Sequence, residues 1–125
     1  MTDEDDVRRI ALSLPETTQD PGAFRFLVRG TGFAWSYMER VDPKRARVRR
    51  PDVLAVCVAD ESDKQSLLAA DPAKFFTTAH YDGHKSVLVR LPTIDGDELE
   101  ELLTDAWRCR APRALVNHFD SEREA

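Results

Sequence analysis

The apolar residues of this chain switch between the spacing of a helix and the spacing of a strand. Near the amino terminus they recur every three or four positions, which is the period of one helix face; these residues are Val7, Ile10, Ala11 and Leu14. We expect a helix that Thr2 caps and that Pro15 ends, because the residue before a proline is pushed out of helical geometry. Polar and turn-forming residues follow over 16–22, which predicts a loop.

Alternating apolar and polar residues predict the strands that come next. Such alternation covers 24–28 and 33–40, and the nearly continuous apolar run over 53–58 is typical of a strand in the middle of a sheet. A further alternation over 87–91 stops at Pro92. Short connections join the first three strands, so we expect them to form an antiparallel meander.

Three further helices complete the predicted elements. We expect Ser62 to cap the first of them, Asp95 or Asp97 to cap the second, and Pro112 to start the last. The pattern therefore predicts an α+β fold, with a single domain over residues 1–119 in which an antiparallel β-sheet carries helices packed on one face. Residues 120–125 are expected to form a frayed carboxyl-terminal tail.

The charges are unevenly spread along the chain. Eighteen Lys and Arg against 23 Asp and Glu give a net charge of −5, which by itself argues against a nucleic-acid partner. The segment 40–50 nevertheless holds six cations and one acid, Asp42, for a local charge of +5, and the other 114 residues sum to −10. The six cations are Arg40, Lys44, Arg45, Arg47, Arg49 and Arg50. The protein is thus an acidic body with one basic segment.

This basic segment connects two predicted strands, so it should project as a hairpin with Arg45, Arg47 and Arg49 along one edge. Cationic side chains in such a wing pair with phosphates and release counterions, which makes binding weak here and sensitive to salt. Trp35 and Tyr37 on the neighbouring strand would stack on bases. We therefore expect a non-enzymatic protein that contacts DNA through this hairpin. The alternative is a solvated loop whose arginines pair with acidic helices of the same domain.

Two other functions are compatible with the sequence. A pocket between the sheet and the helices would bind a small ligand, a protein partner or a second copy of the chain; its expected lining is Trp35, Tyr37, His80, Tyr81 and His84. On an extended strand His80, Asp82 and His84 would share a face and could ligate the metal of a metal-dependent enzyme. Gly83 favours a turn there instead, which would break that face. No nucleophile elbow occurs in the sequence, so neither a catalytic residue nor a cofactor is predicted.

The remaining composition bears on location and on the two cysteines. The longest apolar run, over 53–59, is far short of the ~20 residues of a membrane span, and no apolar signal sequence follows the acidic start. We expect a cytoplasmic protein without membrane contact, in which both thiols are reduced. Cys57 belongs to an apolar strand and should be a core residue. Arg108 and Arg110 beside Cys109 would lower the pKa of its thiol.

Several short motifs occur in an order and spacing that are jointly specific. They are Leu12-Ser13-Leu14-Pro15-Glu16-Thr17, Phe24-Arg25, Phe33-Ala34, Lys64 with Leu67-Leu68, Ala70-Asp71-Pro72, Phe75-Phe76, Tyr81 with Gly83-His84, Val87-Leu88-Val89-Arg90-Leu91, Asp97-Glu98-Leu99 through Trp107, and Ala111-Pro112-Arg113. Over about residues 3–119 this arrangement resembles the MmcQ/YjbR family, whose members are often described as DNA-binding proteins.

The resemblance implies a small α+β fold with a curved antiparallel sheet, similar to the double wing of a phage transcription factor. The DNA-binding description of the family rests mainly on that similarity of shape, and no catalytic residues come with it. Family members usually have a longer stretch with glycine and histidine before the Phe-Arg strand. Here only Pro21-Gly22-Ala23 precede Phe24, so a groove built by that stretch should be altered or shortened.

Overall fold

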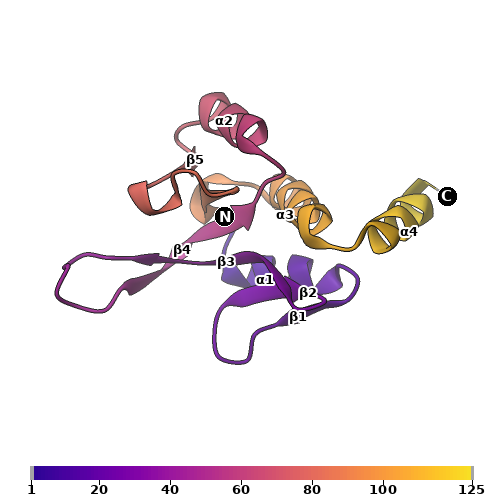
Figure 1. Cartoon of the computed structure of the whole chain (residues 1–125), viewed down its shortest axis with the longest axis horizontal. Coiled ribbons are helices and arrows are strands. Elements are labelled where there is room, and N and C mark those ends of the chain that lie inside the picture. Colours follow the sequence, from indigo (N-terminus) through magenta and orange to yellow (C-terminus); the bar gives the residue numbers. More distant parts are fainter. Residues whose placement is uncertain (1, 125) are drawn as a thin grey trace.

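Six strands form one antiparallel sheet in the computed structural model, which describes residues 2–124 (Figure 1). The strands are β1 (Thr17–Gln19), β2 (Arg25–Val28), β3 (Thr31–Glu39), β4 (Val48–Cys57), β5 (Phe75–Phe76) and β6 (Ser86–Arg90). Their order across the sheet is β1-β2-β3-β4-β6-β5. The α-helices are α1 (Glu4–Ser13), α2 (Glu61–Ala70), α3 (Gly96–Arg110) and α4 (Arg113–Glu124). Two short 3₁₀ helices span Ala79–Tyr81 and Leu91–Thr93.

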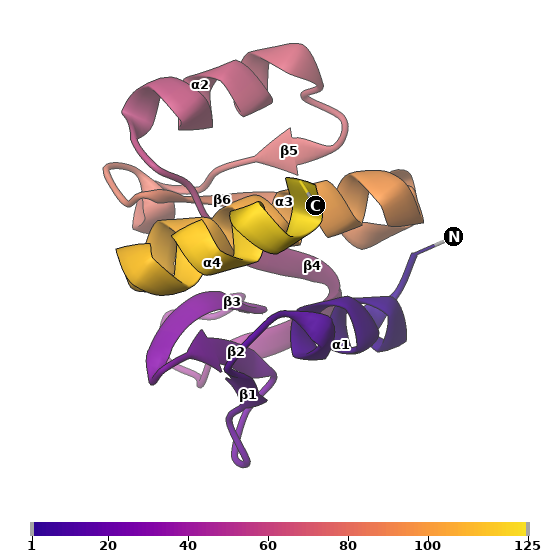
Figure 2. The ribbon, with the colours of Figure 1, turned by 90° about the vertical axis from the view of Figure 1, so that its right-hand side faces the viewer.

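The helices α1 and α3 cover one face of the sheet (Figure 2). Alternate residues of the central strand β4 divide between the two faces, since side chains of a strand point to opposite sides in turn. Leu54 and Val56 lie in the core beneath the helices, whereas Val53 and Ala55 belong to a smaller cluster on the other face. The predicted α+β fold with a single antiparallel sheet and helices on one face is confirmed. No helix within residues 2–124 has the length and hydropathy of a bilayer span.

The start of the chain differs from the sequence prediction in two ways. Asp3, not Thr2, caps α1, because its carboxylate accepts from the backbone N–H of Asp6 while the Asp6 carboxylate accepts from the Asp3 N–H. The Thr2 hydroxyl instead donates to the Ile94 carbonyl at 2.6 Å. The segment predicted as a loop over 16–22 contains strand β1, which pairs with β2. Its polar sequence concealed an edge strand whose side chains are exposed or half-buried.

Helix ends also differ from the prediction. Asp60 rather than Ser62 caps α2, and the expected frayed tail from residue 120 is helical as far as Glu124. Contacts with α3 explain the longer helix α4: the rings of Phe119 and Trp107 lie 4.9 Å apart, and a carboxylate oxygen of Asp120 accepts from Arg108 Nη2 at 2.7 Å. These contacts depend on tertiary packing, which the local pattern does not reveal.

Strands β3 and β4 form a long hairpin that extends beyond the rest of the molecule (Figure 1, left). The register changes between the pair Ser36–Leu54 and the pair Tyr37–Arg50, so β4 carries three additional residues, 51–53, at this point. Pro51 has no N–H to donate to a neighbouring strand, which suits a bulge. The bulge therefore separates the part of the hairpin inside the sheet from the part that projects.

Candidate nucleic-acid interface

The loop 40–47 at the tip of the β3–β4 hairpin is held by its own side chains. A carboxylate oxygen of Asp42 accepts from the Lys44 N–H at 2.9 Å. Arg40 Nη1 lies within hydrogen-bond distance of the carbonyl oxygens of Pro43 and Arg45, at 3.3 and 3.2 Å. Arg40, predicted to assist phosphate binding, therefore shapes the loop that carries the other cations.

Two of the six predicted phosphate contacts are paired with acids outside the loop 40–47. Arg49 Nη2 lies 2.6 Å from the Glu4 carboxylate in the first turn of α1, and Arg50 Nε donates to Glu39 across the hairpin. Arg49 fits the alternative from the sequence, arginines paired with acidic helices of the same domain, because Glu4 belongs to α1. Arg50 pairs instead with an acid of strand β3. Arg49 also lies against the Phe24 ring, 5.3 Å from its centroid, on the side of the sheet that faces α1. Arg49 therefore does not share an edge with the loop cations.

The cations at the end of the hairpin remain open to solvent. The Arg45 side chain is 84% exposed, and its Nε lies 3.7 Å from the Asp42 carboxylate. Lys44 and Arg47 are exposed too, and their side chains form no ion pair with any residue in 2–124. We call Lys44, Arg45 and Arg47 the tip cations. Lys44 and Arg47 are free to meet an anion, and Arg45 is exposed with a loose ion pair to Asp42.

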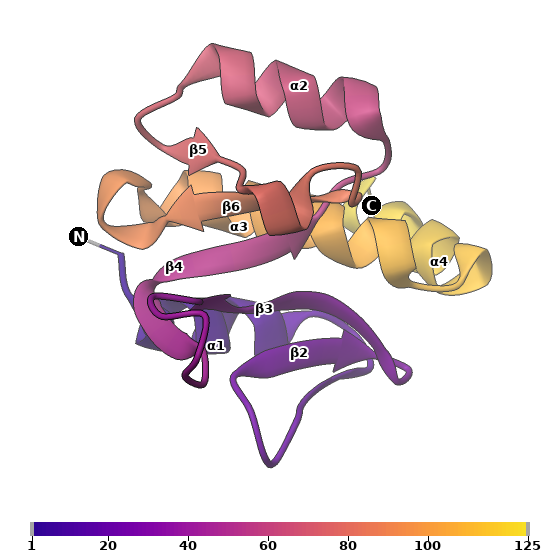
Figure 3. The same cartoon turned by 60° about the vertical axis from the view of Figure 1, so that its left-hand side comes forward.

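The five predicted pocket residues come together in the structure. Trp35 Nε1 donates to the Tyr81 hydroxyl at 3.1 Å, and the Tyr37 ring lies 6.2 Å from the Tyr81 ring and 6.3 Å from the Phe76 ring. His80 and His84 adjoin Tyr81. This cluster lies on the sheet face that α1 and α3 leave uncovered (Figure 3). Four of the five, Trp35, His80, Tyr81 and His84, line a small pocket of about 200 Å³, which Arg110 at the end of α3 also lines. Tyr37 lies beside this pocket and extends it into an aromatic surface.

The proposed metal-ligand set is not assembled. His80 is the middle residue of the 3₁₀ helix Ala79–Tyr81, and Gly83 has a φ angle of +81°. Residues 80–84 therefore do not form an extended strand. The His80 and His84 rings stack on each other with centroids 5.8 Å apart. Among the described residues no group of three or more His, Cys, Asp or Glu side chains is placed to hold a metal ion. The His80, Asp82 and His84 hypothesis therefore lacks its geometric basis.

A buried lysine positions the histidine-bearing turn. Lys64 on α2 is 1% exposed, and its ammonium donates to the carbonyls of Tyr81 at 2.6 Å and His84 at 3.0 Å. Sequence reasoning gave Lys64 no role, since one lysine in a polar helix has no local signal of burial. Its only sign in the sequence was its place among the motifs shared with the family.

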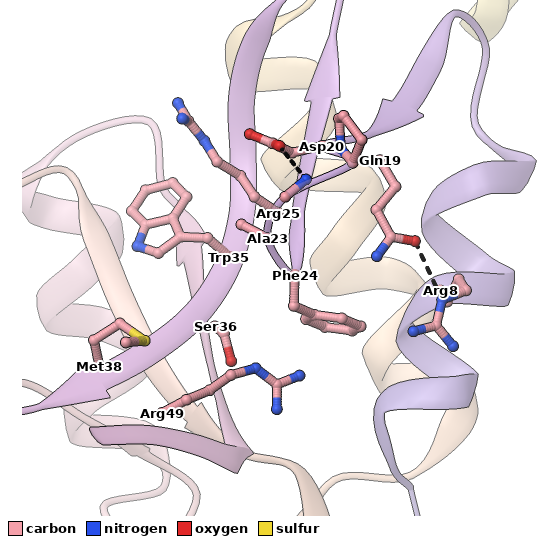
Figure 4. Close-up of a pocket in the computed structure, with 12 residues that line it drawn as sticks. Arg8, Gln19, Asp20, Ala23, Phe24, Arg25, Trp35, Ser36, Met38 and Arg49 are labelled. Carbon is pink, nitrogen blue, oxygen red and sulfur yellow. Dashed lines mark hydrogen bonds between the residues drawn. The ribbon is translucent and has the colours of Figure 1, made fainter. Parts of the chain in front are cut away.

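A groove beside the β3–β4 hairpin adjoins the aromatic surface, because Trp35 belongs to both. It has a volume of about 760 Å³ and is formed by α1, the β1–β2 connection, β3 and β4 (Figure 4). The Pro21-Gly22-Ala23 stretch lines it, so the short connection does not remove a groove at this place. Its other lining residues include Arg8, Phe24, Arg25, Ser36, Met38 and Arg49. Sequence reasoning missed this groove because the residues come from four separate elements.

The two cysteines lie near each other at the carboxyl end of α3. Cys57 is buried, as predicted, and Arg110 Nε donates to its sulfur at 3.2 Å. Desolvation raises the pKa of the Cys109 thiol, and the neighbouring Cys57 and Asp105 add to the rise. The predicted lowering of this pKa is wrong, because Arg108 is paired with Asp105 and Asp120 and the weaker effect of Arg110 does not offset burial.

We expect Cys109 to react with iodoacetamide more slowly than glutathione does at pH 8. A raised thiol pKa means a smaller thiolate fraction, and the thiolate is the nucleophile. The alkylation rate, followed by mass spectrometry, should continue to rise as the pH passes the usual range of a cysteine. The Cys109→Ser variant, which keeps only the buried Cys57, serves as the control. A rate that is already at its plateau at pH 7 would contradict the raised pKa.

These observations define a small α+β protein with an open six-stranded antiparallel sheet, a basic hairpin tip and an aromatic sheet face. The sequence profile of the YjbR family matches residues 12–109. The chain belongs to the YjbR family.

The chain is also similar to proteins from two mycobacteria and to one solved structure. Proteins described as uncharacterized from Mycobacterium bovis and Mycobacterium tuberculosis are 41% identical to this chain, over 92% of its length and 93% of theirs. The crystal structure of the Deinococcus radiodurans protein DR2400, described by the domain DUF419, superimposes with a TM-score of 0.61 at 22% identity. That match covers 86% of this chain and 77% of the other, and it supports the fold.

Proposed function

We propose that this protein binds DNA without catalysis, through phosphate contacts made by the tip cations of the β3–β4 hairpin. The observation that carries the proposal is the projection of Lys44, Arg45 and Arg47 from the body, with Asp42 as the nearby acid. Cations that are not neutralised by the protein gain most from phosphate, because each contact releases a condensed counterion. Arg49 and Arg50 are left out of the interface, since Glu4 and Glu39 already pair with them.

The aromatic surface extends the proposed interface along the sheet. Tyr37 stands opposite Arg50 in the hairpin, and from there the open face continues to Trp35 and Phe76. The Arg90 guanidinium lies 4.0 Å from the centroid of the Phe76 ring. Aromatic faces accept the stacked bases of single-stranded DNA without sequence preference, and neighbouring arginines hold the backbone. The combination favours binding that depends little on sequence.

The charge of the body sets the expected strength of binding. The 114 residues outside 40–50 sum to −10, so a polyanion approaches the tip against repulsion from the rest of the chain. Three phosphate contacts give a slope of about −2.7 for log K against log salt on duplex DNA. Binding is therefore weak, oriented by the hairpin, and lost at moderate salt.

The test is a titration of labelled duplex DNA with the wild type and two charge-matched variants at several salt concentrations. Arg45→Glu with Arg47→Glu removes two tip cations, so we expect binding to fall below detection even at low salt. Arg113→Glu with Arg123→Glu makes the same change of net charge on α4, at the other end of the molecule (Figure 1). This control should lose only a small part of the affinity, through the weak long-range effect of net charge.

Two results would overturn the proposal. One is wild-type protein without salt-dependent binding of DNA. The other is equal loss of affinity in the two variants, which would assign the effect to net charge rather than to the hairpin. Circular dichroism of each variant should match that of the wild type, because all four arginines are exposed.

A further inference from the structure

We propose that the groove between α1, the β1–β2 connection and the β3–β4 hairpin is a binding site for a small monocarboxylate with an apolar body. The groove volume of about 760 Å³ is in the range of sites that enclose small molecules. Figure 4 shows the Ser36 hydroxyl, the Phe24 ring and the Arg49 guanidinium directed toward one region of it. The site is separate from the tip cations and adjoins the aromatic surface at Trp35.

The Ser36 side chain is the first reason to assign a ligand. Ser36 is 7% exposed, lines the groove, and its hydroxyl has no hydrogen-bond partner among the described residues. An unpaired buried hydroxyl costs about 1–3 kcal/mol relative to a satisfied one. Its backbone N–H is already used, since it donates to the Phe24 carbonyl at 2.9 Å. A bound acceptor in the groove would satisfy the hydroxyl. Without a ligand, an alanine at this position would give a more stable protein than the serine does.

The arginines supply donors that the protein itself does not use. Arg49 contacts Glu4 through Nη2 only, so its Nε and Nη1 hydrogens have no acceptor within residues 2–124. Arg8 donates to Asp5 through Nη1 and to Gln19 through Nε, and its Nη2 hydrogens have no acceptor within residues 2–124. Both guanidinium groups flank the Phe24 ring, at 5.4 Å for Arg8 and 5.3 Å for Arg49. The donors are thus fixed in place before a ligand arrives.

The charge balance selects the class of anion. Three arginines line the groove, but Asp20 lines it too, and Glu4 and Asp5 neutralise two of the guanidinium groups. The three arginines and three acids balance, so each negative charge of a ligand remains uncompensated, and a phosphate dianion or a polyanion adds more such charge than a single carboxylate. The single carboxylate would gain hydrogen bonds from Ser36 and Arg49. Phe24 and Met38 offer apolar contact beside these donors. An aryl or branched alkyl group attached to the carboxylate fits this lining.

The experiment uses the full chain and a panel of four probes: benzoate, phenylacetate, indole-3-acetate and isovalerate. Each probe is paired with its neutral carboxamide and compared with inorganic phosphate. We expect at least one carboxylate at millimolar concentration to shift the amide NMR signals of residues 19–25 and of Ser36. The carboxamides and phosphate should bind at least about tenfold more weakly, because the hydrogen bonds to a charged group are lost or the charge is mismatched.

Two serine variants separate a ligand site from a general effect. Ser36→Ala should keep or raise the melting temperature of the free protein, while it weakens carboxylate binding by about tenfold or more. Ser62→Ala changes an exposed serine at the start of α2 and should bind like the wild type. The variant with Arg45→Glu and Arg47→Glu should also bind the carboxylate normally, so this result does not depend on the DNA proposal.

The proposal is wrong if no carboxylate of the panel shifts the signals of the groove residues. It is also wrong if carboxylate and carboxamide bind equally, or if Ser36→Ala binds as tightly as the wild type. Equal binding of phosphate would overturn the monocarboxylate assignment.

Discussion

Replacing Lys64 by methionine is expected to lower the free energy of unfolding by about 2–5 kcal/mol. The methionine would leave the carbonyls of Tyr81 and His84 without their donor in a site where Lys64 is 1% exposed. Small domains are stable by about 5–15 kcal/mol, so the loss is a large fraction of the total. Urea unfolding followed by circular dichroism measures it. Hydrogen exchange should also become faster in the 79–84 turn, which α2 no longer holds.

Lys85→Met is the matched control for this variant, because it removes an exposed lysine next to the same turn. Its effect on stability should be within about 0.5 kcal/mol of zero. An equally small effect of Lys64→Met would show that Lys64 does not anchor the turn. The result bears on the aromatic surface, since the carbonyls that Lys64 holds belong to residues of that surface.

The second large effect is expected for Trp107→Ala, at about 3–5 kcal/mol of lost stability. The Trp107 ring is fully buried between α3 and the core, and its Nε1 donates to the Pro15 carbonyl at 3.0 Å. The Phe119 ring of α4 packs against it. The variant therefore opens a cavity, leaves a carbonyl unpaired and removes the contact that docks α4. Thermal and urea unfolding give the size of the loss.

Two other variants test the cause of that loss. Trp107→Phe keeps much of the volume but not the N–H, and we expect a smaller cost of about 1–3 kcal/mol. Trp35→Ala removes the same side chain from the half-buried open face and should cost less than Trp107→Ala. If Trp35→Ala were as destabilising as Trp107→Ala, the open face would be as important to the core as the helix-covered face.

Most elements of this fold could be predicted because their signals are local. Helix α3 has an apolar stripe, an acidic first turn and a basic last turn, and β6 alternates until Pro92 stops it. The predictions failed where the local signal is weak or equivocal. β1 is a polar edge strand of three residues that takes its stability from pairing with β2. Thr2 and Asp3 each have an acid three residues later, Asp5 and Asp6, so the sequence alone did not decide which of the two caps α1. In the structure Asp3 is the cap, because its side chain and that of Asp6 bond to each other's backbone N–H.

The candidate site was only partly predictable for a different reason. The six cations of 40–50 could be read from the chain, but their availability could not. Arg49 meets Glu4 across 45 positions of sequence, and this pair exists because β4 brings Arg49 beside the first turn of α1. The same packing left Lys44, Arg45 and Arg47 exposed at the end of the hairpin. The number of charged residues follows from the sequence, whereas the neutralisation of a cation depends on its distance from an acid in the folded chain.

The sequence by itself determined the class of fold, the order of most helices and strands, the family, and the presence of one basic segment on an acidic chain. Periodicity, turn residues and motif spacing are enough for these, because each acts over a few neighbouring positions. Only the tertiary structure decided which cations are free, which sheet face stays open, how Lys64 holds its turn, and that Ser36 lies unpaired in a groove. Each of these depends on strand register and helix packing, which bring together residues that are far apart in the chain.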